Sequence, residues 1–133
     1  MKNRINFRII SLLFMIPLFI YAASFDGLTE LATAFKKSDS KTIASYFDTM
    51  IEIKISDKEG TYSKSQGEQI LKDFFEKNNV IDFHFKHDGA SGANNAQYAI
   101  GSISTSSGKF RTYIYMKKKG DTFVIQELTI ENE

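Results

Sequence analysis

One stretch of the sequence, residues 62–75, has the pattern of an amphipathic helix with a well-marked start. Two overlapping capping boxes lie at its entry, Ser63 with Gln66 and Ser65 with Glu68. The large apolar residues that follow share one stripe at helical spacing: Ile70, Leu71, Phe74 and Phe75. A helix with such a stripe must bury it, so the chain needs a sheet against which this helix can pack.

The rest of the sequence supplies two further helices and the strands of that sheet. Upstream, residues 26–37 and 41–47 have helical spacing, residues 50–55 alternate between apolar and polar side chains, and residues 57–60 resemble a turn. Downstream, four alternating stretches are separated by turn residues: 81–86, 97–104, 110–117 and 123–130. The order helix, helix, strand, helix and four strands predicts an α+β fold in which a curved antiparallel sheet surrounds packed helices.

A turn expected at Ser107 and Gly108 predicts which side chains share a face of the sheet. The face that we expect to be buried carries Ala99, Gly101, Ile103, Phe110, Thr112, Ile114 and Met116. The opposite face carries Tyr98, Ile100, Ser102, Arg111, Tyr113 and Tyr115. In the last strand the parity of the apolar residues changes, so we expect a bulge near Gln126 and Glu127.

The outer face combines residue types that are enriched in protein interfaces. Its candidate interface residues are Tyr98, Arg111, Tyr113 and Tyr115. They indicate a protein-protein interface on this face. The alternative is an ordinary polar sheet face in which Tyr contributes only its preference for strands.

The first 23 residues have the pattern of a secretory signal peptide. Three basic residues precede an apolar run at residues 9–20, and Ala22 and Ala23 are small enough for cleavage. The run is shorter than the roughly 20 residues of a membrane-spanning helix. We therefore expect residues 1–23 to be removed and residues 24–133 to form one exported domain, periplasmic or extracellular, with no membrane span. The alternative is a retained anchor.

Charge and cysteine content exclude several classes of function. Three of the 17 Lys and Arg residues lie in the expected signal peptide, which contains none of the 16 Asp and Glu residues. The remaining domain is slightly acidic and lacks the clustered cationic face that nucleic acid requires. The chain has no Cys, so we expect no disulfide and no thiolate zinc site.

Several motifs along the chain resemble those of one family: Tyr62-Ser63-Lys64, His87-Asp88-Gly89, Tyr98-Ala99-Ile100-Gly101, Gly108-Lys109-Phe110-Arg111 and Ile125-Gln126-Glu127-Leu128. The element order resembles the nuclear transport factor 2-like superfamily, also called the cystatin-like or cone fold. The motifs resemble its secreted bacterial branch known as domain of unknown function 4783. The resemblance implies helices packed in the concavity of the sheet, in the order α-α-β-α-β-β-β-β, and no established activity. Two residues depart from the family pattern: Gly67 stands where we would expect Ala, and Thr129 stands where we would expect a basic residue.

Enzymes of this superfamily, such as steroid isomerases and polyketide cyclases, place an Asp or His and Tyr hydroxyls inside the cone, where burial shifts their pKa values. Here the expected inward positions are mainly apolar, with Asp48 and Glu127 as the nearest candidate acids. We therefore expect no catalytic residue and no cofactor. The two histidines, His84 and His87, are three apart on a strand and should face opposite ways, which argues against a metal site.

Three hypotheses about function remain open. The first is an exported, non-catalytic interaction module whose partner is a second copy or an envelope protein. The second is a small apolar-ligand binder, or an isomerase- or cyclase-like enzyme, that uses the cone interior with His87, Tyr98 and Glu127 as polar contacts. In this hypothesis His87 points inward, because it has the parity of Phe83 and Phe85. The third is a structural domain of an envelope assembly.

Overall fold

The computed structural model describes residues 27–91 and 95–133, so the expected signal peptide and the start of the first helix at Asp26 lie outside the described residues. The described helices are α1 (Gly27–Lys36), α2 (Ser40–Ser45) and α3 (Lys64–Lys77). The strands are β1 (Phe47–Ile55), β2 (Lys58–Ser63), β3 (Val80–Ala90), β4 (Ala96–Thr105), β5 (Gly108–Lys119) and β6 (Thr122–Asn132).

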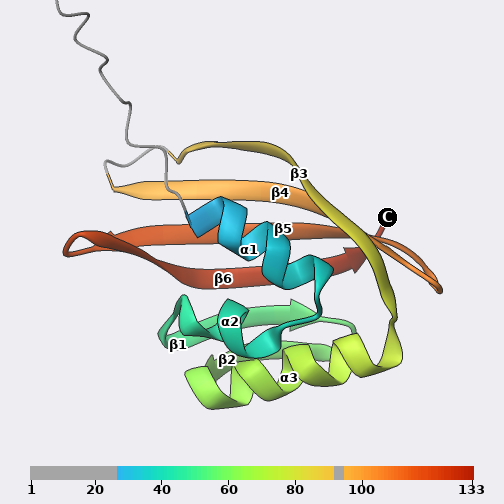
Figure 1. Ribbon diagram of the computed structural model, residues 1–133. Helices are drawn as coiled ribbons and strands as arrows, with labels where there is room; N and C mark the ends of the chain where they lie inside the picture. The colour runs from blue at the N-terminus through green and yellow to red at the C-terminus, as the bar shows by residue number, and fades with distance from the viewer. Residues whose placement is uncertain (1–26, 92–94) are drawn as a thin grey trace, which may run out of the picture.

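The strands form one sheet in the order β2-β1-β6-β5-β4-β3, and the helices lie on one of its faces (Figure 1). α1 packs against β3, and α3 packs against β1 and β2. Strands β3 to β6 pair antiparallel in sequence order, whereas β1 pairs parallel with β6. The predicted α+β cone and its element order are confirmed, with one added strand, β2, between β1 and α3. No helix within the described ranges has the length and apolarity that a membrane crossing requires.

Two boundaries near β1 differ from the expectation. The second helix ends at Ser45 instead of Phe47, because Phe47 already pairs with Ile125 of β6 and its ring is buried. The residues expected to form a turn instead form β2, an edge strand that pairs with β1. Its charged, exposed sequence lacks apolar alternation, as is typical of edge strands. The sequence pattern therefore contained no sign of it.

α3 begins as predicted at the first of the two capping boxes. The Ser63 hydroxyl accepts a hydrogen bond from the backbone N–H of Gln66, whose side chain accepts one from the backbone N–H of Ser63. The second box does not form, because Ser65 already lies inside the first turn. Leu71 and the two Phe residues after it are buried, whereas Ile70 is only partly covered.

Gly67 is buried at the contact between α3 and β1. A Cβ atom at this position would lie 3.0 Å from both Ile53 Cδ1 and Phe47 Cε2. The absence of a side chain therefore lets the helix approach the strand closely. This explains why Gly stands where the family resemblance leads us to expect Ala.

The concave side of the sheet is filled by aromatic rings. Phe35 stacks on Phe83 with ring centroids 4.6 Å apart, and Phe74 meets Phe110 edge-on at 5.1 Å. Phe75 bridges the two pairs, at 6.2 Å from Phe35 and 5.7 Å from Phe74. Edge-on and offset contacts of this kind add to the stabilisation from burial. The stripe of α3 therefore packs against the sheet through a continuous cluster of Phe side chains.

The predicted faces of β4 and β5 are confirmed. The turn between them is formed by Ser106 and Ser107, one residue earlier than expected, because Thr105 pairs with Gly108. This shift changes no side chain's face, since it moves the register by two residues. The bulge in β6 is also confirmed: consecutive residues of β5 pair with Glu127 and Ile125, which leaves Gln126 as the extra residue.

Candidate functional site

A second bulge, in β3, decides where His87 lies. Phe85 pairs with Gly101 on the helix side of the sheet, whereas His87 pairs with the next residue of β4, Ile100. Lys86 is therefore an extra residue, and the side chains after it change face. The prediction that His87 points into the cone is wrong, because the bulge turns it onto the outer face. His84 faces the same way, so the expectation of opposite faces is also wrong.

His87 contacts Tyr98 on this outer face. The Tyr98 hydroxyl oxygen lies 2.7 Å from His87 Nε2, and the ring centroids are 5.5 Å apart. A Cβ atom on Gly89 would lie 3.2 Å from the same hydroxyl oxygen. Gly89 thus leaves room for the Tyr98 ring to lie across β3 toward His87.

Rows of side chains cross the outer face from strand to strand. From β4 to β2, one row consists of Tyr98, Tyr115, Glu127, Glu52 and Thr61. The neighbouring row consists of Ile100, Tyr113, Thr129, Lys54 and Glu59. Both rows are aromatic or aliphatic on β4 and β5 and mostly polar or charged on β6, β1 and β2. The outer face therefore has two chemically different halves.

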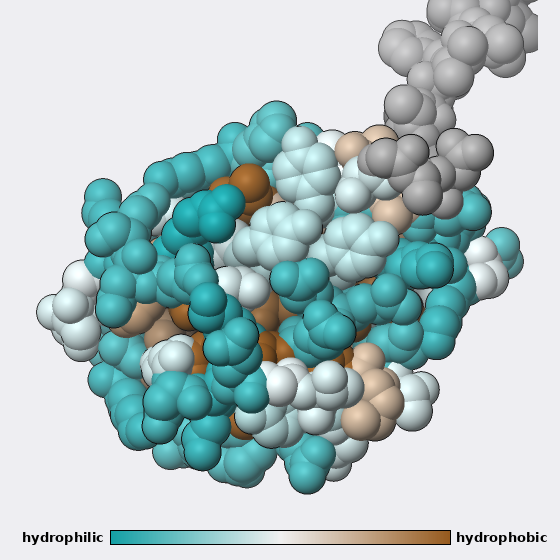
Figure 2. Space-filling view, turned by 180° about the vertical axis from the view of Figure 1, so that it is seen from behind, coloured by the Kyte–Doolittle hydropathy of each residue, from teal (hydrophilic) through white to brown (hydrophobic). Residues whose placement is uncertain are grey.

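We call the first half the aromatic patch; it consists of Tyr98, Ile100, Tyr113 and Tyr115. All four side chains are half-buried by their neighbours and half-exposed to solvent. Figure 2, turned by 180° from Figure 1, looks directly at this outer face. Pale aromatic rings gather above its centre, and no helix lies over them. The patch thus offers aromatic surface that the described residues leave open.

We call the second half the acidic hollow; it contains the carboxylates of Glu52, Glu59 and Glu127. Two adjoining depressions of about 320 and 370 Å³ share Glu52, Thr61 and Glu127 in their walls. Lys54 also lines the hollow, but its ammonium group is 3.2 Å from Glu131, which raises the pKa of Lys54. Within residues 27–91 and 95–133, the three carboxylates of the hollow form no ion pair.

Within the aromatic patch, Tyr113 lies next to the polar half, since it pairs with Thr129 of β6. Burial raises the pKa of its phenol, and the negative charge of Glu127 raises it further. The hydroxyl is therefore protonated at neutral pH and can donate a hydrogen bond. Two residues away on the same face of β5, Arg111 is exposed and lies opposite Glu131 of β6, whose carboxylate pairs with Lys54. The outer face thus carries charged side chains of both signs.

A family model described as "Domain of unknown function (DUF4783)" matches residues 28–131. The chain belongs to the DUF4783 family. Similar solved structures include a DUF4783 family protein from Bacteroides ovatus ATCC 8483, with 24% identity, a TM-score of 0.72, and coverage of 77% of this chain and 92% of that chain. No curated protein matches the sequence.

Two more distant structures confirm the fold of this DUF4783 domain. A domain of unknown function with a cystatin-like fold from Nostoc punctiforme PCC 73102 has 8% identity and a TM-score of 0.62, over 79% of this chain and 72% of that chain. An NTF-2 like protein of unknown function from Silicibacter pomeroyi DSS-3 has 9% identity and a TM-score of 0.57, over 80% and 91%. The cystatin-like, nuclear transport factor 2-like cone is therefore confirmed.

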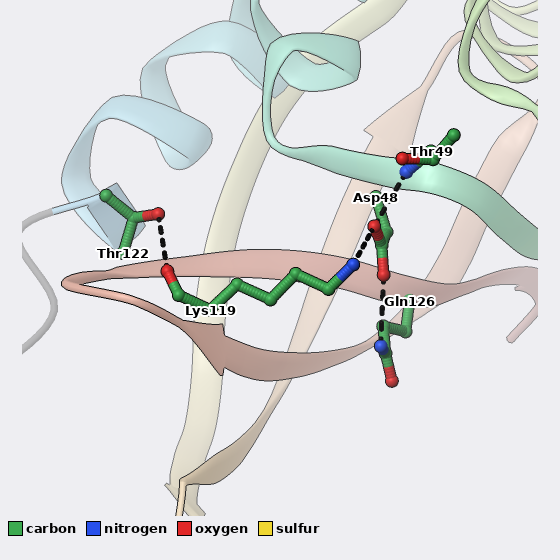
Figure 3. Close-up of polar contacts among 5 residues, drawn as sticks. All are labelled: Asp48, Thr49, Lys119, Thr122 and Gln126. Carbon is green, nitrogen blue, oxygen red and sulfur yellow. Dashed lines mark hydrogen bonds and ion pairs between the residues drawn. The ribbon is translucent and has the colours of Figure 1, made fainter.

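Asp48, one of the candidate acids, has a structural role in this DUF4783 domain (Figure 3). Its carboxylate accepts hydrogen bonds from Lys119 Nζ at 2.6 Å, Gln126 Nε2 at 3.1 Å and the backbone N–H of Thr49 at 2.7 Å. The Lys119 ammonium lowers the pKa of this carboxyl group more than the other two partners do. Asp48 therefore ties β1 to the bulged residue of β6 and is held in its ionised form.

The DUF4783 domain brings all the proposed site residues together on one face. His87, Tyr98 and Glu127 share the outer face with Arg111 and the other tyrosines instead of lining the cone interior. No sequence pattern points to Glu52 or Glu59, because their proximity to Glu127 depends on the pairing of β1 with β6 and β2. Among the described residues, no group of three or more His, Asp or Glu side chains could hold a metal ion.

Proposed function

We propose that this DUF4783 protein is an exported, non-catalytic interaction module that binds a second copy of itself through the outer face of its sheet. The observation that carries the proposal is the aromatic patch, which lies on a sheet face that no described helix covers. Tyr side chains provide large contact area at a small loss of conformational entropy, which is why they are enriched in interfaces.

The positions of the other candidate residues also favour a role for the outer face. His87, Tyr98 and Glu127 were the polar contacts expected for a small apolar ligand inside the cone. Their side chains lie on the opposite side of the sheet from the Phe cluster. A ligand inside the cone would have to displace packed Phe rings and would meet none of these three groups.

The dimer is tested by sedimentation equilibrium and by size-exclusion chromatography with light scattering on the purified protein. We expect a concentration-dependent dimer, and we expect Tyr113→Ala combined with Tyr115→Ala to shift it to monomer. Ile81→Ala is the control, since Ile81 is a 69% exposed apolar residue of β3 outside the patch. Far-UV circular dichroism verifies that each variant folds. A wild-type protein that is monomeric at every concentration would overturn the homodimer.

Export is the second part of the proposal and rests on the signal-like pattern of residues 1–23. Intact-mass spectrometry on the protein recovered from the cell envelope and the medium tests it. We expect a mass that corresponds to a chain beginning at or near Ser24. Full-length protein confined to the cytoplasm would contradict export without affecting the dimer.

A further inference from the structure

The aromatic patch is shared evenly between two neighbouring strands. Tyr98 of β4 pairs with Tyr115 of β5, and Ile100 of β4 pairs with Tyr113 of β5. A two-fold axis that runs along the strands, between β4 and β5, would lay β4 of one copy on β5 of the other. Each of the four side chains would then face its own cross-strand neighbour in the second copy. The whole patch would therefore be covered by a second patch.

The direction of the axis also decides which strands are buried. An axis along the strands reverses the strand order, so β6 faces β3 of the second copy, and β1 and β2 lie beyond the edge of that copy's sheet. An axis across the strands would instead lay every strand on its own equivalent. It would bury the exposed charged residues of β1 and β2 in both copies: Glu52, Lys54 and Glu59. Because charged groups are costly to desolvate and are depleted from interface cores, burial favours the axis along the strands.

The charged residues of β5 and β6 do enter such an interface, where they meet uncharged or histidine positions of the second copy. The facing pairs are Lys117 with Ala96, Lys109 with Ser104, Arg111 with Ser102, Glu127 with Gly89 and Glu131 with His84. Glu131 also keeps its ion pair with Lys54 of its own copy. At the rim Glu133 faces Asp82, and each of these carboxylates has a lysine partner in its own copy. No unpaired like charges are therefore forced together.

We propose, resting on the homodimer proposed above, that its two-fold axis runs along the strands between β4 and β5, so that β3 to β6 form the interface and β1 and β2 stay outside it. Face-to-face sheets with nearly aligned strands pack about 10 Å apart. The aromatic patch then lies at the centre of the interface. The β1 and β2 side of each acidic hollow remains in solvent, one hollow on each flank of the dimer.

Distances between equivalent residues of the two copies test the direction of the axis. The chain has no Cys, so one introduced Cys carries one spin label, and double electron–electron resonance measures the separation of the two labels in a dimer. The label positions are Lys109→Cys and Lys117→Cys, toward the two ends of β5, and Glu59→Cys on β2. All three side chains are exposed. Far-UV circular dichroism verifies that each labelled variant folds.

An axis along the strands keeps both ends of β5 close to their equivalents. β5 lies half a strand spacing from this axis, so Lys109 and Lys117 should both give separations of about 20 Å or less. Glu59 lies three and a half strand spacings from the axis, which is about 17 Å. Its two labels should therefore be about 34 Å apart.

An axis across the strands gives a different pattern. Lys109 and Lys117 are eight residues apart on β5, or about 27 Å, so such an axis cannot pass close to both. Their two separations would add up to at least about 54 Å. Glu59 lies in the row of Tyr113, midway between these two lysines. The two copies of Glu59 would then lie closer together than at least one of the lysine pairs.

The dissociation constant of the dimer, measured by sedimentation velocity, is a second and independent readout. Glu52→Gln combined with Glu59→Gln should leave Kd within about threefold of wild type, since exposed charges outside an interface contribute little. The matched variant inside the patch is Ile100→Ala, which should raise Kd by about tenfold because it shortens an apolar side chain at the centre of the interface.

The two proposals can fail separately. A separation well above 20 Å at Lys109 or Lys117, or copies of Glu59 closer together than either lysine pair, would overturn this axis and leave the homodimer intact. A tenfold change in Kd on neutralising Glu52 and Glu59 would place the charged half inside the interface and would also overturn it. A monomeric wild-type protein would overturn the homodimer and this arrangement together.

Discussion

Replacing Gly67 with Ala sets local helix preference against tertiary packing. Gly67 lies in the first turn of α3, and its position is buried. In the interior of a helix, Ala is more favourable than Gly by about 1 kcal/mol. Helix preference alone therefore predicts that Gly67→Ala stabilises the protein.

The packing around Gly67 predicts the opposite sign. An added Cβ would lie 3.0 Å from Ile53 Cδ1 and 3.1 Å from Ile51 Cγ2, whereas carbon atoms in contact prefer about 3.5–4.0 Å. The nearby ring of Phe47 is equally close, and all three side chains are at most 3% exposed. Overpacking of a core costs about 1–3 kcal/mol. Subtracting the helix preference, we expect a net loss of about 1 kcal/mol in the free energy of unfolding.

Urea unfolding followed by far-UV circular dichroism measures this change, since the chain has no Trp. All variants are compared at one protein concentration, because association adds to apparent stability. The matched background is Ile53→Val, which removes the Cδ1 atom that the new Cβ would meet. In that background Gly67→Ala should lower the free energy of unfolding by less than it does in wild type. The difference between the two losses is the coupling energy between positions 53 and 67. A Gly67→Ala variant more stable than wild type would refute the packing argument.

Three further predictions concern other contacts of the fold. Asp48→Asn should destabilise the protein by up to about 1 kcal/mol at pH 7. Lys119 holds the folded-state pKa of Asp48 below the unfolded value of about 3.9, so the extra stability of wild type should be lost as the pH falls below about 4. Urea titrations should therefore show a smaller difference in the free energy of unfolding between wild type and Asp48→Asn at pH 3 than at pH 7. An equal difference at both pH values would exclude the ion pair. Ser63→Ala should cost about 1 kcal/mol and increase amide hydrogen exchange in the first turn of α3; unchanged exchange there would contradict the cap. Gly101→Ala should lower the thermal midpoint through a loss of about 2 kcal/mol, because a Cβ would lie 2.6 Å from Phe83 Cζ; an unchanged midpoint would mean that the ring can move aside.

The two bulges illustrate what a sequence pattern can reveal. At Gln126 the flanking residues Ile125 and Leu128 are both apolar and both buried, so the change of parity is visible in the sequence. After Lys86, β3 continues with His87, Asp88, Gly89 and Ala90, and no large apolar side chain records the change of face. The orientation of His87 therefore could not be predicted, because only the pairing of β3 with β4 determines it.

The edge strand β2 and the role of Gly67 have the same explanation. Edge strands are exposed on most sides, so selection does not impose the apolar alternation by which buried strands are recognised. A buried Gly in a helix has no local signature, since the reason for it lies in side chains of another element. Helix caps and stripes are different, because the interacting groups are three or four residues apart in the chain.

The sequence by itself determined the fold class, the start and buried stripe of α3, and the aromatic composition of the outer sheet face. Caps, helical periodicity and strand alternation depend on neighbouring residues, which is why they can be recognised locally. Only the tertiary structure decided which side chains meet on that face, His87 with Tyr98, and Glu127 with Glu52. The reason is that strand pairing, above all the parallel pairing of β1 with β6, brings together residues whose contact no local pattern encodes.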